Sequence, residues 1–369
     1  MNHPIGLYLH IPFCDGKCYY CNFFSEMHDT AFLNEYIEQL KRIARLWAQR
    51  LDRPVKTVYF GGGTPSVLGH ERLIDILNTV KEHFDVDDDS EITVEVNPSG
   101  TIDLDFAALK SVGFNRLSIG LQSADDNELR LLGRRHSTDD VTRTVETAQA
   151  AGFDNISLDV MLAIPEQTLE SLERTLVYCS ERKVQHISAY ILKVEEGTRF
   201  FRDRKRLRLF DDEVQTIFYT YTVDRLSELG YRQYEISNFS LTGYESRHNL
   251  VYWHDEEYLG LGPSAHSFLD GRRFYYPESF DDFFKDLTLF ESEGGDAREY
   301  IMLTLRLTEG LIFDSYRKRY GVSLGDSFFV SAKKLEENGL VKLTPYSLSL
   351  TTKGFLVSNA VIGYLLEST

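Results

Sequence analysis

The sequence predicts an α/β fold in which six strand–helix units form a partial (β/α)6 barrel, followed by a smaller α+β domain. Between residues 5 and 240, short runs rich in β-branched and aromatic residues alternate with longer segments of helical periodicity. After residue 295 the pattern changes to short helices around two closely spaced strands. Alternating strands and helices with right-handed crossovers form parallel sheets, and six such units are expected to curl into an open barrel.

The barrel elements follow one another in regular order. Strands are expected at Ile5–Ile11, Val55–Phe60, Glu91–Val96, Arg116–Leu121, Asn155–Met161 and His186–Leu192. Helices are expected at residues 30–50, 70–84, 102–112, 125–151, 167–182 and 211–229. Functional sites in barrels of this kind form at the carboxyl ends of the strands, so the loops that follow the strands are the places to search.

The chain divides into a barrel over residues 1–230, an aromatic-rich connecting region over 231–294 and a C-terminal domain over 295–369. In the last part we expect helices at Arg298–Leu307, Phe313–Tyr320, Ser327–Gly339 and Lys353–Leu366, with a hairpin of Val341–Leu343 and Ser347–Leu350. Three helices with a two-stranded wing are typical of a winged-helix module, which often binds DNA. This part carries nine basic and eight acidic residues and no basic stripe, so we expect a packing or lid role and no nucleic-acid partner.

Charge and cysteine content narrow the classes of protein further. The formal net charge of −17 disfavours unspecific binding to nucleic acid or anionic lipid. No apolar run approaches the roughly 20 residues that span a bilayer, and no Arg-rich transit segment is visible. Four cysteines in 369 residues without a signal peptide argue against a disulfide framework. We therefore expect a cytoplasmic protein.

Three of the four cysteines lie within eight residues, in Cys14-Asp-Gly-Lys-Cys18-Tyr-Tyr-Cys21, directly after the first predicted strand. A cubic 4Fe–4S cluster is usually held by four thiolates, so three would leave one iron open to a small molecule. This C-x3-C-x2-C spacing is the one that radical S-adenosylmethionine (SAM) enzymes display. A structural zinc site completed by His10 or His28 is the alternative, although zinc loops more often carry a second cysteine pair. The isolated Cys179 is interpreted as a buried structural thiol.

Two further motifs follow the second and third predicted strands. Gly61-Gly62-Gly63-Thr64-Pro65 permits positive φ angles and close approach of the backbone to a ligand, although a glycine run alone is often only a turn. Glu95 ends the third strand, where a buried carboxylate needs a ligand or a cation as partner. A salt-bridged structural glutamate is the alternative interpretation.

Three polar residues lie in, at or just beyond later strand ends. Gln122 could hydrogen-bond a ribose or a carboxylate, Arg134 could pair with a methionine carboxylate, and Asp159 could bind ribose hydroxyls. Each alone is more often a surface or structural polar residue. Their common placement at strand ends favours one shared site.

The chain resembles the oxygen-independent coproporphyrinogen III oxidase-like radical SAM proteins over nearly its whole length. The motifs that carry the resemblance are Tyr8-Leu-His10-Ile-Pro-Phe-Cys14, Gly61-Gly-Gly-Thr-Pro-Ser66, Leu131-Leu-Gly-Arg134-Arg-His-Ser137 and Leu348-Ser-Leu-Thr-Thr-Lys-Gly354. The resemblance implies a 4Fe–4S cluster on Cys14, Cys18 and Cys21 with SAM on its open iron. It places around SAM the residues Tyr8, Gly62, Gly63, Thr64, Glu95, Gln122, Arg134 and Asp159, with Tyr20 near the adenine. One departure is Ala163-Ile164-Pro165, where the family usually has Gly-Leu-Pro.

Two branches of this family differ at positions that the sequence shows. The decarboxylase branch carries a fourth cysteine two residues after the third, where this chain has Phe23, and a longer N-terminal extension. The HemW-type haem chaperone branch lacks that cysteine and carries His-Asn-x-x-Tyr-Trp, present here as His248, Asn249, Tyr252 and Trp253. Such a run supplies an imidazole for haem iron and rings for the macrocycle. The alternative is an aromatic loop packed over the barrel mouth.

The resemblance implies a cytoplasmic haem chaperone that binds a 4Fe–4S cluster and SAM and delivers haem to apo-haemoproteins. A reductant such as flavodoxin or ferredoxin would supply electrons, and a homodimer is possible. Two alternatives are an oxygen-independent coproporphyrinogen III oxidase, which would act on a porphyrinogen, and a related radical SAM methyltransferase. Whether the protein is an enzyme stays open at this point, and no catalytic residue is assigned.

Overall fold

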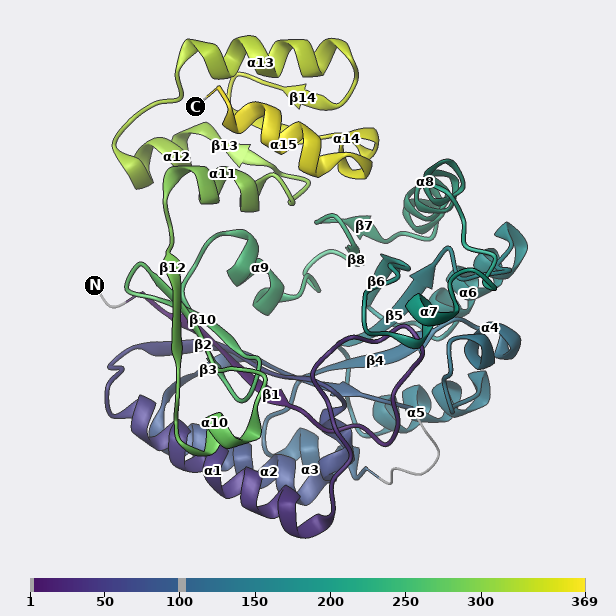
Figure 1. The fold of residues 1–369 in the computed structure, drawn as a ribbon, viewed down its shortest axis with the longest axis vertical. Helices are drawn as coiled ribbons and strands as arrows, with labels where there is room; N and C mark the ends of the chain where they lie inside the picture. The colour runs from purple at the N-terminus through teal and green to yellow at the C-terminus, as the bar shows by residue number, and fades with distance from the viewer. Residues whose placement is uncertain (1–2, 99–103, 369) are drawn as a thin grey trace.

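The protein is built on one large twisted sheet, shown by a computed structural model that describes residues 3–98 and 104–368 (Figure 1). Its twelve strands lie in the order β12-β11-β10-β9-β1-β2-β3-β4-β5-β6-β8-β7. The central strands β1 to β6 are parallel and adjacent in chain order, which confirms the predicted partial barrel. They span Ile5–Ile11, Pro54–Gly62, Asp85–Val96, Arg116–Gln122, Ile156–Leu162 and His186–Ile191.

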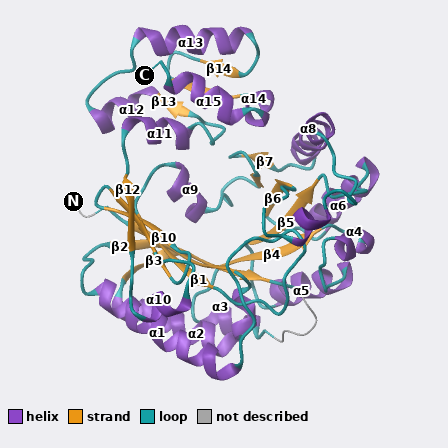
Figure 2. Cartoon of the chain, in the orientation of Figure 1, coloured by secondary structure: helices purple, strands orange, loops and turns teal. Residues whose placement is uncertain are grey.

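Side chains alternate between the two faces of these strands. In β4, Leu117, Ile119 and Leu121 are fully buried in the main hydrophobic core, whereas Ser118 and Gln122 take the other face. Successive residues of a strand point to opposite faces, so one face is aliphatic and the lumen is polar. Helices cover the outside of the sheet, as the purple ribbons around the orange strands show (Figure 2).

The helices of the barrel region follow the predicted order. They are α1 Thr30–Ala48, α2 His70–His83, α3 Phe106–Ser111, α4 Asp126–Leu131, α5 Thr138–Ala150, α6 Leu169–Glu181, α7 Arg199–Asp203 and α8 Asp212–Glu228, with a 3₁₀ turn at Pro65–Leu68. The start of the helix expected at 102–112 lies partly outside the described residues. The short α7 was not predicted.

The single helix expected over 125–151 is wrong, because the chain breaks between α4 and α5. Gly133 has a φ of 75°, which ends α4, and Ser137 starts α5 with a capping box to Asp140. This break turns the intervening Arg134 toward the carboxyl ends of the strands, where it lines a cavity.

The connecting region extends both edges of the sheet, which sequence reasoning did not foresee. Its strands are β7 Arg232–Gln233, β8 Asn238–Ser240, β9 Tyr258–Leu261, β10 His266–Leu269, β11 Arg272–Tyr275 and β12 Leu289–Glu293, and its helices are α9 Arg247–Trp253 and α10 Phe280–Phe284. β8 pairs antiparallel with β6, and β9 pairs parallel with β1. These strands have two to five residues, too few to display a clear period.

The C-terminal part packs at one end of the molecule as a small α+β unit (Figure 1). It contains α11 Ala297–Thr304, α12 Phe313–Tyr320, α13 Asp326–Glu337, α14 Thr352–Leu356 and α15 Ser358–Leu366. Its sheet has three strands, β13 Leu311–Ile312, β15 Ser347–Leu350 and β14 Val341–Leu343, instead of the expected two. The expected final helix is two helices that meet at Val357.

Ion pairs hold this C-terminal unit against the connecting region. Asp255, which is 2% exposed, accepts Arg319 Nη2 at 2.7 Å and lies 3.4 Å from Arg273 Nη2. His254 pairs with Glu309 at 2.9 Å. The two arginines offset the cost of burying the aspartate, and the Arg319 contact fixes the C-terminal unit to the connecting region. No helix among residues 3–98 and 104–368 is long and apolar enough to cross a membrane.

Candidate functional site

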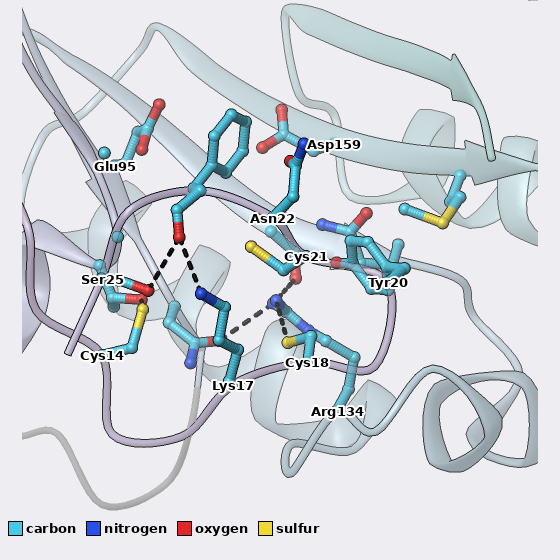
Figure 3. A pocket seen from close by; sticks show the side chains of 18 of the residues that line it. Cys14, Lys17, Cys18, Tyr20, Cys21, Asn22, Ser25, Glu95, Arg134 and Asp159 are labelled. Atoms are coloured by element: carbon cyan, nitrogen blue, oxygen red, sulfur yellow. Dashed lines mark hydrogen bonds between the residues drawn. The ribbon is translucent and has the colours of Figure 1, made fainter. Parts of the chain in front are cut away.

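The three clustered cysteines lie on the loop between β1 and α1 and face one cavity of about 440 Å³ (Figure 3). Cys14, Cys18 and Cys21 are each half-buried and unpaired with other cysteines, whereas Cys179 is fully buried in the core. The cavity therefore has three thiols on one wall, at the carboxyl ends of the parallel strands. This is the edge of the barrel where the sequence predicted a site.

The glycine turn after β2 supports the cysteine loop from below. Gly63 N–H donates to the Ile11 carbonyl at 2.9 Å, and Thr64 N–H donates to the Phe13 carbonyl at 2.7 Å. A Cβ at Gly63 would lie 2.6 Å from the Phe13 carbonyl oxygen, and Gly62 has a φ of 116°. A side chain at Gly63 would displace the loop, and side chains rarely tolerate the φ of Gly62, so both positions favour glycine. Thr64 Oγ1 also lies 3.3 Å from Cys14 Sγ.

Two carboxylates form the opposite wall. Glu95 on β3 accepts the Tyr59 hydroxyl at 2.9 Å, and Asp159 on β5 accepts the Ser118 hydroxyl at 3.2 Å. Burial raises the pKa of Glu95 to about 7, and the nearby negative charge of Asp159 adds to that rise. Burial also raises the pKa of Asp159 to about 6, opposed by hydrogen bonds from serines. These acids therefore titrate near neutral pH and gain from a ligand that donates hydrogen bonds or carries positive charge.

Arg134 brings a positive charge between the cysteines and the strands. Its Nη2 donates to the Gly120 carbonyl at 2.7 Å and to Asn97 Oδ1 at 3.0 Å, and its Nη1 lies 3.6 Å from Cys18 Sγ. Its Nε is buried and has no hydrogen-bond partner among the described residues. An unpaired buried N–H is costly, so this atom favours a bound acceptor.

Gln122 ends β4 in an unusual backbone conformation. It is 8% exposed and has a φ of 68°, which few residues other than glycine adopt. Conformations of this kind cluster at functional sites, where the surrounding structure imposes them. The side chain lines the cavity beside Gly120.

Eight of the nine residues expected around SAM line this single cavity, and Tyr8 does not. The eight are Tyr20, Gly62, Gly63, Thr64, Glu95, Gln122, Arg134 and Asp159. Tyr8 lies deeper in the lumen, where its hydroxyl bonds His10 Nδ1 at 3.0 Å and its ring stacks on Tyr59. It supports the cavity floor without lining it.

Sequence reasoning did not assign several lining residues. Asn97 and Gly120 lie two residues from the assigned Glu95 and Gln122, and Ser118 lies four residues before Gln122, so all three point to the same side as those residues and line the cavity. Strand alternation could have found all three. Tyr190 and Lys193 also line the cavity at the end of β6, without a motif that marks them.

The zinc alternative lacks a fourth ligand in this structure. Within the described part of the chain, no three His, Cys, Asp or Glu side chains gather around one position for a single ion. Both nitrogens of His10 are engaged, by Tyr8 and by the Phe24 carbonyl at 3.3 Å. His28 bonds Glu26 and stacks on Phe32. Three thiols spread along a cavity wall fit a larger inorganic cluster better than one tetrahedral ion.

The residues expected at the haem lie at the opposite end of the barrel. His248 is 1% exposed, its Nδ1 bonds Thr57 Oγ1 at 2.8 Å, and its Nε2 bonds the Tyr252 hydroxyl at 2.8 Å. Burial lowers the pKa of His248 to about 3, so its ring is neutral. Asn249 lies in the first turn of α9, and the Trp253 indole helps to stabilise the buried Glu235 carboxylate. None of these four residues is among those that line the cavity.

Comparison with known proteins decides the family. The radical SAM superfamily model matches residues 8–179, and the HemN C-terminal domain model matches residues 296–357. The protein named heme chaperone HemW of Bacillus subtilis is 35% identical over 97% of this chain and 98% of its own. The chain belongs to the HemW family of radical SAM proteins. Membership in the HemW family confirms the resemblance that the motifs indicated.

Other relatives extend the HemW comparison. The heme chaperone HemW of Mycobacterium tuberculosis is 35% identical over 98% of this chain and 95% of its own. The mitochondrial radical S-adenosyl methionine domain-containing protein 1 of Bos taurus is 34% identical over 98% and 87%. Among solved structures, coproporphyrinogen III oxidase (HemN) of Escherichia coli covers 99% of this chain and 90% of its own with a TM-score of 0.83. At 22% identity, that likeness shows the fold alone.

Proposed function

We propose that this protein is a cytoplasmic haem chaperone that binds a 4Fe–4S cluster and SAM and passes haem to apo-haemoproteins. The observation that carries the proposal is the 35% identity to a heme chaperone HemW over nearly the whole of both chains. The position where the decarboxylase branch has its fourth cysteine is Phe23, which is 64% exposed at the cavity. The site thus offers three thiolates for cluster binding and no fourth at that position.

The cavity residues fit both cofactors. Cys14, Cys18 and Cys21 would hold the cluster, and Arg134 would balance the negative charge of the thiolates. Glu95 and Asp159 would accept hydrogen bonds from SAM, whose sulfonium and ammonium offset the cost of burying the two acids. When bound, the pair supplies one-electron chemistry at the sulfonium, and the protein contributes orientation and exclusion of water.

Haem contact through α9 requires a local rearrangement. A neutral imidazole is the form that ligates iron, and the low pKa keeps His248 in that form. Its Nε2 is held by the Tyr252 hydroxyl, so iron ligation by Nε2 requires Tyr252 to turn away. We therefore propose His248 as the iron ligand only in a state in which Tyr252 has released it, with Asn249, Tyr252 and Trp253 beside the macrocycle.

A haem titration with two variants tests this ligand assignment. His248→Ala is expected to change the Soret spectrum and weaken haem binding, because the imidazole is lost. Tyr252→Phe is expected to strengthen binding several-fold, because one hydrogen bond of about 1 kcal/mol no longer competes for Nε2. If both variants bind haem as the wild type does, His248 is not the ligand. Because Tyr252→Phe is expected to gain affinity, its result tests the assignment even if the alanine variant is misfolded.

The function itself is tested by anaerobic turnover beside haem transfer. Reconstituted protein receives coproporphyrinogen III, SAM and reductant, with an active HemN enzyme as control, and the tetrapyrroles are separated by chromatography. We expect no decarboxylation here, and transfer of bound haem to an apo-haemoprotein measured by its absorbance spectrum. Formation of protoporphyrinogen would overturn the chaperone proposal in favour of the oxidase alternative.

A further inference from the structure

A dense group of cations interrupts an otherwise acidic chain. Residues 199–208, Arg-Phe-Phe-Arg-Asp-Arg-Lys-Arg-Leu-Arg, contain six basic residues and one acidic residue in a protein of net charge −17. We call this stretch the basic segment. It comprises α7 and the loop that leads to α8, and all six basic side chains are exposed.

Most of these cations have no structural partner. Arg199 pairs with Asp203 at 3.3 Å, and the Arg204 guanidinium lies over the Phe201 ring. The side chains of Arg202, Lys205, Arg206 and Arg208 make no hydrogen bond or ion pair to any residue that the structure describes. Like charges at this density repel one another, so folding alone does not account for the segment.

The basic segment lies directly against the loop that carries the cysteines. Phe200 N–H donates to the Tyr19 carbonyl at 2.8 Å, and the Arg199 guanidinium lies 3.8 Å from the centre of the Tyr19 ring. Tyr19 lies between Cys18 and Cys21 in the sequence. In Figure 1 the purple loop passes beside α7. The first residues of the basic segment therefore lie beside the cluster-binding loop.

Two further cations continue the positive surface along the cysteine loop. Lys17, within the loop, is exposed and donates to the Phe23 carbonyl at 3.0 Å. Arg135 is exposed and donates to the Asp15 carbonyl. Acidic residues flank the segment in the sequence, at Glu195–Glu196 before it and at Asp211–Glu213 after it, where Asp211 caps α8. The basic segment, Lys17 and Arg135 thus form a local concentration of exposed cations in a protein whose net charge is negative.

We propose that the basic segment, with Lys17 and Arg135, docks an acidic one-electron donor protein against the cysteine loop. The inference rests on the cluster-binding half of the proposed function and not on haem. One electron leaves the reduced donor, which is oxidised by one, and enters the cluster, which is reduced by one. No bond forms or breaks. Complementary charge steers such encounters and orients the partner, which suits a brief electron-transfer contact.

Binding of a purified flavodoxin tests the proposal without any turnover. The docking variant is Lys205→Glu/Arg206→Glu/Arg208→Glu, and the matched control is Lys333→Glu/Lys334→Glu/Lys342→Glu in the C-terminal unit, where the lysines are also exposed. Fluorescence anisotropy of labelled flavodoxin measures affinity at low and at physiological ionic strength. We expect roughly tenfold or greater weakening for the docking variant at low salt and little change for the control.

Iron content and SAM binding should stay unchanged in the docking variant, which shows that the site is intact. Equal weakening by the control variant would mean that only net charge matters, and would overturn the proposal. Equally tight binding of an acidic protein without a redox centre, or of anionic vesicles, would overturn it as well. If haem transfer fails while flavodoxin still docks, the chaperone proposal fails and this inference stands.

Discussion

Arg134 and His248, at opposite ends of the barrel, differ in how fully their polar side-chain atoms are paired. At the carboxyl ends of the strands, Arg134 keeps an Nε without a partner among the described residues, and Glu95 and Asp159 have raised pKa values. At the other end, His248 has both ring nitrogens bonded and its backbone N–H is accepted by Glu91 at 3.0 Å. The first arrangement is costly until a ligand binds, whereas the second stabilises the empty protein. A ligand can therefore bind at Arg134 without rearrangement, whereas at His248 it requires Tyr252 to turn away.

The largest expected effect is on cluster binding, when a cysteine is replaced at the carboxyl ends of the strands, which we call the open end. Replacing Cys14, Cys18 or Cys21 by alanine removes one of three thiolates, and we expect nearly all cluster iron and the visible absorbance of the cluster to be lost after anaerobic reconstitution. Cys179→Ala is the matched control, because that thiol is buried in the core and faces no cavity. Retention of a full complement of iron by any of the three loop variants would place the cluster elsewhere.

At the amino ends of the strands, which we call the closed end, the expected effect of a substitution is a loss of folding stability. His248→Ala removes a buried ring that stacks on Tyr59 at 5.0 Å and leaves the hydroxyls of Thr57 and Tyr252 without their partner. We expect the free energy of unfolding to fall by about 3 kcal/mol in chemical denaturation of the cofactor-free protein. His254→Ala, which removes a half-exposed hydrogen bond with Glu309, is the control and should cost less than about 1 kcal/mol. Similar losses for both histidines would contradict the closed-end interpretation.

Most residues that line the cavity at the open end could be predicted, because short sequence motifs identify them. Cysteine spacing, a glycine run and polar residues at strand ends sit next to the strands that position them, and parallel strands bring their carboxyl ends to one edge. Of the expected SAM residues, only Tyr8 does not line the cavity. Tyr8 lies in the middle of β1, so its side chain points into the lumen below the strand ends, where its hydroxyl bonds His10.

The closed end could not be predicted in the same way. His248 reaches Thr57 across 191 residues of sequence, and no local pattern encodes that contact. Arg116, at the start of a predicted strand, is 2% exposed in the lumen, although an arginine at a strand end is usually on the surface. The sheet extensions β7 to β12 were missed for a related reason, because their short segments are held by pairing with strands distant in the sequence.

The smallest expected effect concerns Glu95 and is seen in its pH dependence. The pKa of this half-buried acid is raised to about 7 from an ordinary value near 4.5, so the folded protein binds a proton that the unfolded chain releases. Stability of the cofactor-free protein therefore falls as the pH rises from about 4.5 through 7. Because the carboxylate keeps some contact with the cavity, we expect this loss to amount to about 2 kcal/mol.

Glu95→Gln should remove the part of the slope above about pH 6, since the amide does not titrate and Asp159, with a pKa of about 6, contributes mainly below that pH. The variant should also make the cofactor-free protein more stable than the wild type at pH 8. The measurement is the free energy of unfolding by denaturant at pH 5, 6, 7 and 8, with the exposed Glu35→Gln as control. SAM should restore stability to the wild type most strongly at the alkaline end, because a cationic ligand favours the ionised carboxylate. A wild-type slope between pH 6 and 8 that survives in Glu95→Gln would show that Glu95 is not the group that titrates there.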